Sequence, residues 1–354
     1  MSNIKDFEIE NGVLEAYQGT GGAVQIPHGV RKIGDEAFRL CTAMTSLVIP
    51  ETVTEIGNGA FEGCTKLQTL TIPKSVRRIG DGAFCFCTGL SSIEVQADNP
   101  VYHSAGSCLI KTKTGTLVQG CNGSVIPTDG SVCAIADEAF FGCTGLCAIS
   151  IPACVTSIGE GAFSCCTSLA QIVVENGNPV YHSAGNCIIE TATKTLIQGC
   201  YLSVIPRDGS VCTIGEGAFR GTMALSQLTL PEGIATIGDS AFKGCTALTS
   251  IELPRGLKSV GWEAFAHCTA LSAILFPEGV TQIGDEACAG CTSLTAIMLP
   301  ETLEYVGEWA FYHCEKLRGI YFTGSEATWS RLEKPDDLFP DNTRIRFDCK
   351  MKNG

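Results

Sequence analysis

Thiols are the reactive groups that recur most often in this sequence, and their spacing could serve disulfide, metal or redox chemistry. The chain has 354 residues and 21 cysteines. The segment Cys288-Ala-Gly-Cys291 has the spacing of a redox pair, and Cys85-Phe-Cys87 and Cys165-Cys166 also bring thiols close in sequence. Each of these segments, however, contains one member of a regular series of cysteines.

The series recurs at one position of a repeated sequence, and we call it the thiol series. Neighbouring coils of a stacked β structure lie about 4.8 Å apart, whereas the Cβ atoms of a disulfide lie about 3.8 Å apart. We therefore predict reduced thiols that pack in the core, because free Cys behaves as a small hydrophobe. A thiol-based redox or metal-binding protein is the alternative. The nine members, interrupted only by Thr222, are Cys41, Cys64, Cys87, Cys143, Cys166, Cys245, Cys268, Cys291 and Cys314.

The other candidate groups favour neither catalysis nor a cofactor. His267 and His313 share a repeat position two coils apart, so about 10 Å separates them, which is too far for one metal ion. His103 and His182 are expected to be structural or surface residues. The loop from Gly19 to Gly22 lacks the Lys-Ser/Thr that completes a phosphate-binding loop, so we interpret it as a turn. We expect no enzyme, no cofactor and no metal.

A repeated phenylalanine reveals the elements that position these residues. The steps between successive members are mostly 23 residues, with two of 56. A fixed period of this size predicts a solenoid, in which each coil stacks only on its neighbours. We call this repeat position the phenylalanine slot. It holds Phe38, Phe61, Phe84, Phe140, Phe163, Phe219, Phe242, Phe265, Cys288 and Phe311.

Each regular coil has the same expected anatomy. Leu67-x-x-Leu70-x-Ile72 predicts a short strand with Thr71 facing outward. Pro73 ends that strand because proline donates no backbone hydrogen bond. The segment from Gly80 to Phe84 predicts a short helical turn, and the acidic residue after the glycine suits its positive end. The glycine itself is expected to allow close packing between layers.

Two segments and both ends depart from the regular period. Residues 95–125 and 174–204 begin with the same Asn-Pro-Val-Tyr-His-Ser-Ala-Gly block and predict enlarged coils with protruding hairpins. We expect an N-terminal cap hairpin over residues 1–25, a solenoid over 26–322 and a C-terminal cap over 323–354. About twelve coils follow from ten regular and two enlarged units.

The unit Cys-x-x-Leu-x-x-Ile-x-Ile-Pro-x-x-Val-x-x-Ile-Gly-x-x-Ala-Phe resembles the BspA-like class of leucine-rich repeats over roughly residues 7–349. The resemblance implies a right-handed α/β solenoid with a parallel sheet on its concave face. It also implies a non-catalytic role, because characterised members are bacterial surface or secreted proteins that bind host proteins or other cells. The family has no shared catalytic residues.

Charge and hydropathy narrow the partners and the compartment. The net charge of −13 and the pI of about 4.9 argue against nucleic acid, whose phosphates need clustered Lys and Arg. No apolar run approaches the roughly 18 residues of a membrane span. The N-terminus lacks an apolar signal-peptide core, so we expect a cytoplasmic protein, or a surface or secreted one if an export signal was removed.

The outward positions of the predicted strands supply the one candidate binding site. The early members of this column are mostly small or polar, whereas Leu275, Met298 and Tyr321 are large, and Arg318 lies nearby. Exposed apolar residues with a polar rim indicate a partner site. We therefore predict that a protein partner binds Leu275, Met298, Arg318 and Tyr321. The alternatives are that the C-terminal cap covers this column, or that the chain is a purely structural spacer.

Overall fold

A computed structural model describes residues 4–340 and 343–350 and shows a solenoid of about fourteen turns. The chain divides into two compact units: unit 1 comprises residues 1–169 and 174–179, and unit 2 comprises residues 170–173 and 180–354. Residues 1–3, 341–342 and 351–354, which we assigned to the caps from the sequence, lie outside the described residues.

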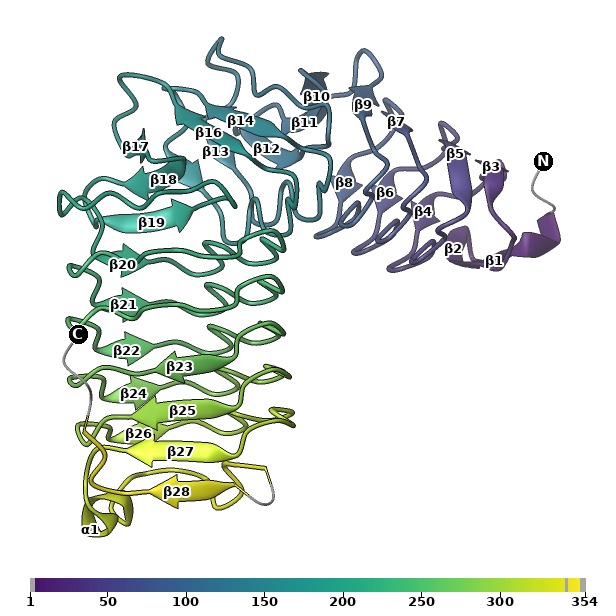
Figure 1. Cartoon of the computed structure of the whole chain (residues 1–354). Coiled ribbons are helices and arrows are strands. Elements are labelled where there is room, and N and C mark those ends of the chain that lie inside the picture. Colours follow the sequence, from purple (N-terminus) through teal and green to yellow (C-terminus); the bar gives the residue numbers. More distant parts are fainter. Residues whose placement is uncertain (1–3, 341–342, 351–354) are drawn as a thin grey trace. The chain divides into compact units, whose positions relative to one another are not determined.

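Unit 1 begins with an antiparallel hairpin and continues as parallel coils (Figure 1). Asn11 and Gly12 form the expected hairpin turn with φ values of 51° and 81°. The strands of its first sheet are β1 (Phe7–Glu10), β2 (Val13–Tyr17), β4 (Lys32–Ile33), β6 (Glu55–Ile56) and β8 (Arg78–Ile79). The second is β10 (Tyr102–Ala105), β11 (Cys108–Lys111), β12 (Thr116–Gln119), β13 (Ala134–Ile135) and β15 (Ser157–Ile158). Its other strands are β3 (Gly22–Gln25), β5 (Met44–Val48), β7 (Thr69–Ile72), β9 (Ser92–Val95) and β14 (Ala148–Ile151).

Unit 2 contains the longest sheet, which runs through eight strands. They are β17 (Tyr181–Ala184), β18 (Cys187–Glu190), β19 (Thr195–Gln198), β20 (Thr213–Ile214), β21 (Thr236–Ile237), β22 (Ser259–Val260), β24 (Gln282–Ile283) and β26 (Tyr305–Val306). A second sheet orders β23 (Ala273–Leu275), β25 (Ala296–Leu299), β27 (Gly319–Phe322) and β28 (Arg344–Arg346). The remaining strand of the chain is β16 (Gln171–Val174).

The enlarged segments form three-stranded antiparallel elements. In residues 95–125, β10 pairs with β11 and β11 with β12, and in residues 174–204 β17, β18 and β19 repeat this arrangement. The predicted hairpin around Lys111–Gly115 is therefore present, and a second hairpin precedes it. β12 and β19 then join the parallel coils that follow them.

Most regular coils carry two strands, where the sequence predicted one, but the coils at 225–231 and 248–254 have only an isolated bridge in place of the Leu-x-Ile-Pro strand. The more continuous sheets run through the two-residue strands before the Ile-Gly glycine, whereas the predicted Leu-x-Ile-Pro strands pair only in short groups. Proline removes one N–H donor at the end of each Leu-x-Ile-Pro strand. The Ile-Gly strands gain from close approach, because a Cβ on Gly57 would lie 2.6 Å from Asp35 N and 2.7 Å from Gly34 C. That glycine therefore serves close packing, as predicted.

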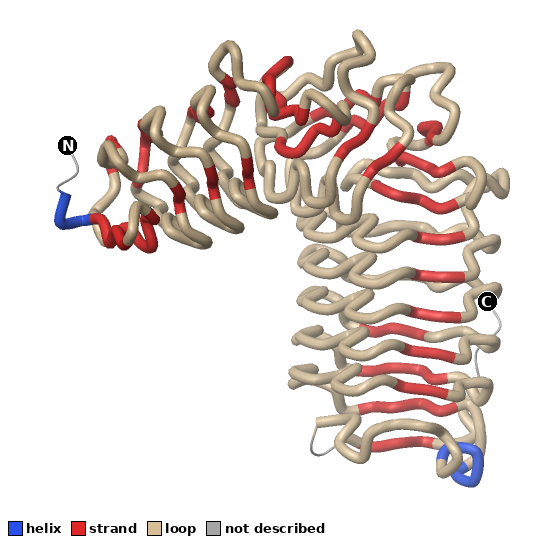
Figure 2. Tube along the Cα trace, turned by 180° about the vertical axis from the view of Figure 1, so that it is seen from behind, coloured by secondary structure: helices blue, strands red, loops and turns tan. Residues whose placement is uncertain are grey.

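The described residues contain less helix than the sequence predicted, because the expected short helical turns are not helical. In the described residues only α1 (Glu326–Trp329) and the 3-10 turn η1 (Ile4–Asp6) are helical, and Figure 2 shows turns and short strands elsewhere. Ser325 caps α1 by accepting a hydrogen bond from Thr328 N at 3.2 Å. The Ala-Phe segments are turns, because residues two before and two after the phenylalanine slot have positive φ in every regular coil.

Carboxylates near these turns bind the next coil instead of a helix end. Asp35 Oδ1 accepts from Asn58 N at 2.9 Å, and Asp239 Oδ1 accepts from Trp262 N at 2.8 Å. Asn58 Oδ1 accepts from Asp81 N in the same way. Each bond pairs a backbone N–H with an acceptor 23 residues away, so these side chains hold successive turns in register.

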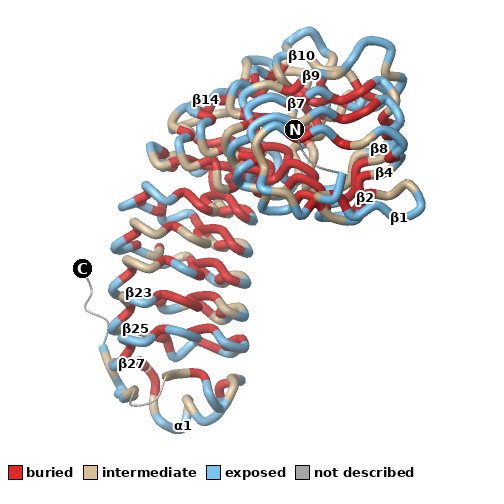
Figure 3. Tube along the Cα trace, turned by 90° about the vertical axis from the view of Figure 1, so that its right-hand side faces the viewer, coloured by how far each residue is buried: buried red, intermediate tan, exposed pale blue. Residues whose placement is uncertain are grey.

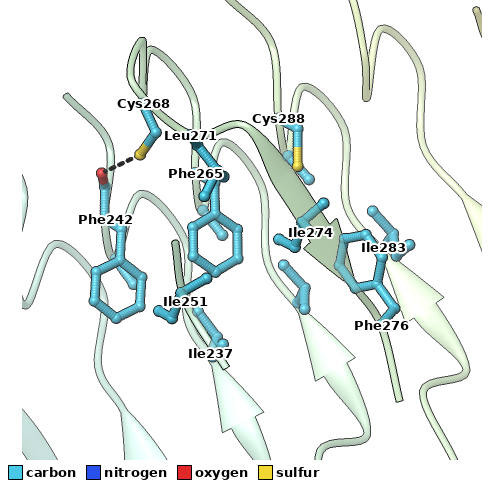
Figure 4. Close-up of a cluster of buried hydrophobic side chains, with 14 of the residues drawn as sticks. Ile237, Phe242, Ile251, Phe265, Cys268, Leu271, Ile274, Phe276, Ile283 and Cys288 are labelled. Carbon is cyan, nitrogen blue, oxygen red and sulfur yellow. Dashed lines mark hydrogen bonds between the residues drawn. The ribbon is translucent and has the colours of Figure 1, made fainter. Parts of the chain in front are cut away.

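Stacked phenylalanines form the core inside both units, which is buried along its length (Figure 3). Phe38, Phe61 and Phe84 stack with ring centroids 5.0 and 5.5 Å apart in unit 1. In unit 2 the rings of Phe242 and Phe265 are 5.2 Å apart and nearly parallel, surrounded by Ile, Leu and Cys side chains (Figure 4). Aromatic contacts of this kind add to the hydrophobic burial that holds coils together.

The coil count exceeds the expected twelve because the ends also fill the phenylalanine slot. Tyr17 stacks on Phe38 at 5.1 Å, and Phe339 stacks on Phe311 at 5.5 Å. In the enlarged coils the slot is held by Gly120 and Gly199, whose N–H groups donate to Ala139 O and Ala218 O in the next coil. A Cβ on either glycine would lie 2.1 Å from the next phenylalanine ring, so only glycine fits there.

Removing one ring from this stack should be costly. We predict that Phe61→Ala lowers the free energy of unfolding by about 3–5 kcal/mol, because Phe61 is fully buried and a cavity would replace its ring. Thr71→Ala, at an exposed strand position, is the control and should change little. Chemical denaturation measures both, and an unchanged midpoint for Phe61→Ala would show that the ring is not part of the core.

The close approach at the Ile-Gly glycine can be tested separately. Gly57→Ala should destabilise the protein by about 1–3 kcal/mol, because the added methyl overlaps backbone atoms of the preceding coil. Gly233→Ala is the matched control, since its Cβ would meet only Val211 O at 3.8 Å. Equal unfolding midpoints for the two variants would contradict the packing role.

Candidate functional site

The predicted binding residues share one face of a four-stranded parallel sheet in unit 2. β23, β25, β27 and β28 place Leu275 beside Met298, Met298 beside Tyr321, and Tyr321 beside Arg346. The alternating side chains of β23, β25 and β27 point inward as Ile274, Ile297 and Ile320, which are buried. The alternation of side chains along each strand thus places Leu275, Met298 and Tyr321 in one outward column. The pairing of β28 with β27 adds Arg346 to this column.

Exposure decreases from Leu275 to Tyr321 along this column, whereas Arg346 at its end is exposed. Leu275 is 56% exposed, whereas Met298 and Tyr321 are half-buried. The Tyr321 ring lies over Gly319, where a methyl group would approach its Cε2 to 3.1 Å. The Arg346 guanidinium lies 5.5 Å from the centre of the same ring. Leu275 is thus open to solvent, and Tyr321 is partly covered by its neighbours.

The described part of the C-terminal tail packs on the end of the core, and its Arg346 also reaches the column at the Tyr321 ring. β28 continues the sheet beside β27. Trp329 packs on Phe322 with ring centroids 5.1 Å apart, and Phe339 packs on Phe311. The fourth predicted residue, Arg318, is exposed and donates through Nη1 to Glu315 O and Leu317 O, both at 2.8 Å. Its guanidinium is therefore held near its own turn.

A groove of about 1010 Å³ lies beside this column within unit 2. Leu230, Ile251 and Leu253 contribute apolar surface, and Glu252 and Arg255 contribute charge. Leu275 belongs to the same lining, so the groove and the predicted column are continuous. No residue pattern in the sequence signals this groove, because its lining is assembled from four successive coils.

Two further exposed apolar residues, one in each unit, were also missed at the level of sequence. Val125 and Val204 each precede an Ile-Pro pair in an enlarged coil, and they are 71% and 72% exposed. A hollow of about 250 Å³ contains both Val204 and Thr229, as expected for neighbours in one column. The Ile-Pro signal could have found both valines. Apolar outward residues are therefore not confined to the C-terminal coils, as Val48 at 56% exposure also shows.

The thiol series lies in the core and bonds to backbone. Cys64 Sγ donates to Phe38 O at 3.3 Å, and Cys268 Sγ donates to Phe242 O at 3.2 Å (Figure 4). Equivalent bonds recur in both units, each to the carbonyl of the preceding phenylalanine slot. All 21 cysteines lie in the described part of the chain, and none forms a disulfide. The series therefore fills space and also satisfies buried carbonyl groups.

Burial makes these thiols poor nucleophiles. Desolvation raises the pKa of Cys314 to about 12 and that of Cys41 to about 11. A hydrogen bond with Cys291, together with burial, raises the pKa of Cys288 well above its usual value. Reactive cysteines need a lowered pKa, so the raised pKa of Cys288 argues against its use as a redox thiol.

The histidines and the glycine-rich loop have structural surroundings. His103 Nδ1 lies 2.9 Å from Thr112 Oγ1, and His182 Nδ1 lies 2.8 Å from Thr191 Oγ1, across the equivalent hairpins. His267 and His313 are exposed at positive-φ turn positions. Gly19 lies under the Tyr17 ring, as a packed turn does. Among residues 4–340 and 343–350, no three His, Cys, Asp or Glu side chains are grouped to hold a metal.

None of the described helices is long and apolar enough to cross a membrane.

Comparisons with known proteins identify the repeat. A sequence model of the BspA type leucine rich repeat region matches in six copies, over residues 15–115, 117–187 and 212–331. The chain is 30% identical to a leucine rich cell surface protein of Faecalibacterium prausnitzii, with a TM-score of 0.59 and 96% of each chain covered. The pneumococcal vaccine antigen PcpA shares the fold at 19% identity and a TM-score of 0.58, over 92% of this chain and 73% of that one. No curated protein matches the chain.

The assignment of the thiols predicts a labelling pattern. At about pH 8, iodoacetamide should modify exposed Cys133 and Cys147 in the native protein, whereas the buried members of the thiol series should react only after unfolding. The raised pKa of a member such as Cys314 leaves almost no thiolate at this pH. Mass spectrometry of labelled peptides gives the readout, and rapid native labelling of Cys288 or Cys291 would instead favour redox chemistry.

Proposed function

The chain belongs to the BspA-type leucine-rich repeat family, and we propose that it is a non-catalytic solenoid that binds a protein partner. The outward column of Leu275, Met298 and Tyr321, with Arg318 beside it, is the proposed contact surface. The observation that carries the proposal is the exposure of Leu275 within a regular sheet, where folding itself requires no large apolar group. Leu275 is followed in register by Met298 and Tyr321, and a contiguous run of large side chains on one face is the feature that marks interaction sites.

The chemistry of the column suits a protein interface. Its centre is apolar, and Tyr and Arg are the residue types that dominate binding hot spots. Arg346, which was not among the residues predicted from the sequence, extends the column and contacts the Tyr321 ring. Covering apolar surface contributes roughly 25 cal/mol per Å² before the costs of association are subtracted. A partner that spans several coils would therefore gain affinity from many small contacts.

The comparison with a cell surface protein supports a location at the cell surface or outside the cell. That protein is similar over nearly the whole of both chains. A surface location would expose the column to external proteins. It would also place the 21 reduced thiols in a more oxidising setting, where burial in the core protects the thiol series.

Site-specific cross-linking tests the proposal while the identity of the partner is still open. A photo-reactive amino acid replaces Leu275 in the protein, which is expressed in the cell that naturally produces it. This probe should capture one protein species, because Leu275 lies at the centre of the proposed contact surface. The same probe at Val48 is the matched control, since Val48 is equally exposed in the same column of unit 1. Mass spectrometry identifies what is captured at each position.

Substitution of the column should then remove the captured species. The triple change of Leu275, Met298 and Tyr321 to serine should lower binding of that species at least about tenfold, equal to about 1.4 kcal/mol. Loss of folding is excluded if the unfolding midpoint of the triple variant stays close to that of the parent protein. Equal capture at Leu275 and Val48, or unchanged binding by the triple variant, would refute the assignment of the column.

A further inference from the structure

The first sheet of unit 1 carries a row of charged side chains on its outward face. β4, β6 and β8 pair in register and lie side by side in Figure 1, so Lys32, Glu55 and Arg78 follow one another. The Glu55 carboxylate lies 3.1 Å from Lys32 Nζ and 3.7 Å from Arg78 Nη1. One negative charge is thus shared between two positive charges, and the Arg78 side chain is still 72% exposed.

A second row lies directly beside the first. The Thr54 N–H donates to Arg31 O and the Arg77 N–H donates to Thr54 O, both at 2.8 Å, so these residues stack coil on coil. Both arginines are exposed. Arg31 Nη2 donates to Asn11 O at 3.4 Å, and Arg77 Nη1 donates to Lys74 O, so each guanidinium keeps further N–H groups for a ligand. We call the four cations of the two rows the basic patch: Arg31, Lys32, Arg77 and Arg78.

Folding does not require basic residues at these positions. The equivalent pairs in later coils are Thr156-Ser157, Cys212-Thr213 and Ala235-Thr236, and their strands pair in the same parallel way. Neighbouring strands lie about 4.8 Å apart, so the like charges of Lys32 and Arg78 lie about 10 Å apart and repel each other. An anionic ligand would relieve this repulsion.

We propose that the basic patch binds an anionic polysaccharide, a linear sugar polymer that carries sulfate or carboxylate groups. Each row places two cations about 10 Å apart along the stacking direction of the coils. A polymer chain that lies in this direction would contact the cations of a row in turn. Arginine suits this ligand, because the guanidinium donates paired hydrogen bonds to oxyanions. The inference is independent of the protein-binding column, which lies in unit 2.

The surroundings of the patch favour a thin chain over a broad anionic surface. Glu10 lies beside Val13, and Val13 lies beside Lys32 in the register of the sheet, so a carboxylate borders the patch on its N-terminal side. The whole chain has a net charge of −13. A membrane or a nucleic-acid duplex would face these negative charges as well, whereas a single polymer chain can contact the patch alone.

Other anionic partners fit less well. Proteins that bind duplex DNA commonly contact about 6–10 phosphates, more than the four cations of the patch can neutralise. Single-stranded nucleic acid is held by aromatic side chains on which its bases stack, and a membrane surface is held by exposed apolar side chains. Neither kind of residue occurs in the two rows, Arg31-Thr54-Arg77 and Lys32-Glu55-Arg78. An acidic protein would also lack apolar anchor sites there.

Matched polymers test the proposal on the full-length protein. In about 50 mM salt, dextran sulfate should bind and uncharged dextran should not, as measured by isothermal titration calorimetry. Four neutralised charges predict that the logarithm of the association constant falls with the logarithm of salt concentration with a slope of about −3. Polygalacturonate carries carboxylates in place of sulfates, and its affinity relative to dextran sulfate shows which anionic group the patch prefers.

Charge removal should weaken binding only at the patch. The double variant Arg31→Gln/Arg77→Gln should bind dextran sulfate at least about tenfold more weakly, with a salt slope of about −1.4, because two of the four charges remain. Arg207→Gln/Arg255→Gln is the matched control. It removes two exposed arginines that are likewise two coils apart, but in unit 2, and should bind as the parent protein does. All four arginines are exposed, so the unfolding midpoints should hold.

A gain of binding keeps the proposal falsifiable if the double variant fails to fold. Glu55→Gln removes the carboxylate that Lys32 and Arg78 share, so it should tighten the binding of dextran sulfate about two- to fivefold. Glu94→Gln changes the net charge equally at an exposed position of β9, which belongs to a different sheet, and should leave the affinity unchanged.

Four results would overturn the proposal. They are no binding of either anionic polymer, equal affinity of the parent protein and Arg31→Gln/Arg77→Gln for dextran sulfate, tighter binding of duplex DNA or phosphatidylglycerol vesicles than of dextran sulfate at the same salt concentration, and loss of polymer binding in the triple serine variant of the column. The last result would place the polymer on the column of unit 2. The first three would leave the proposed protein-binding surface intact, because cross-linking from Leu275 tests that surface separately.

Discussion

The structure depends on stacking one layer of the core directly on the next, at the spacing of paired strands. In most regular coils a phenylalanine ring and a cysteine thiol both contact the preceding coil and so keep this spacing. The ring packs on its neighbour at 5.0–5.5 Å. The thiol donates to the carbonyl that the preceding ring position leaves inside the core. Serine would bring a stronger donor but less apolar volume, and alanine would leave the carbonyl with one partner fewer. Cysteine fits both demands, which explains its abundance without redox chemistry.

The same constraint determines where the coils can vary. The Ile-Gly strands approach closely, so the position after the isoleucine holds glycine in every regular coil except that of Ala136, and the strand pairing is more continuous there. The turns need two left-handed residues around each phenylalanine. The outward side of the Leu-x-Ile-Pro strands needs neither a close-packed glycine nor left-handed residues. The pairing of these strands is interrupted in places. Sequence change is therefore least disruptive on that side, and there the apolar column and the groove of unit 2 are found.

The period and the identities of the buried residues were enough to predict much of this fold. The 23-residue spacing predicted stacked coils, the phenylalanine core and the location of the thiol series, since each follows from one residue type recurring in phase. Features that depend on two coils at once were missed. Gly120 and Gly199 hold the phenylalanine slot without resembling phenylalanine, and this role is visible only from their bonds to the next coil. The candidate column was predictable from strand alternation, whereas the groove beside it was not. Its lining comes from four successive coils, so it depends on how these coils pack together and not on one recurring residue type.

The central claim is that unit 2 is held together along its Ile-Gly strands and is open along its Leu-x-Ile-Pro strands beside β23. Native-state hydrogen exchange of the free protein measures this directly. The amides of Gly261 and Gly284, which donate to Ile237 O and Val260 O at 2.8 Å, should exchange slowly, at rates set by unfolding of the coils. The amides of Leu253 and Leu275 should exchange orders of magnitude faster, because no backbone acceptor in the described chain receives them. Equal protection of the two pairs would show that the Leu-x-Ile-Pro strands are paired as firmly as the Ile-Gly strands, which would contradict this account.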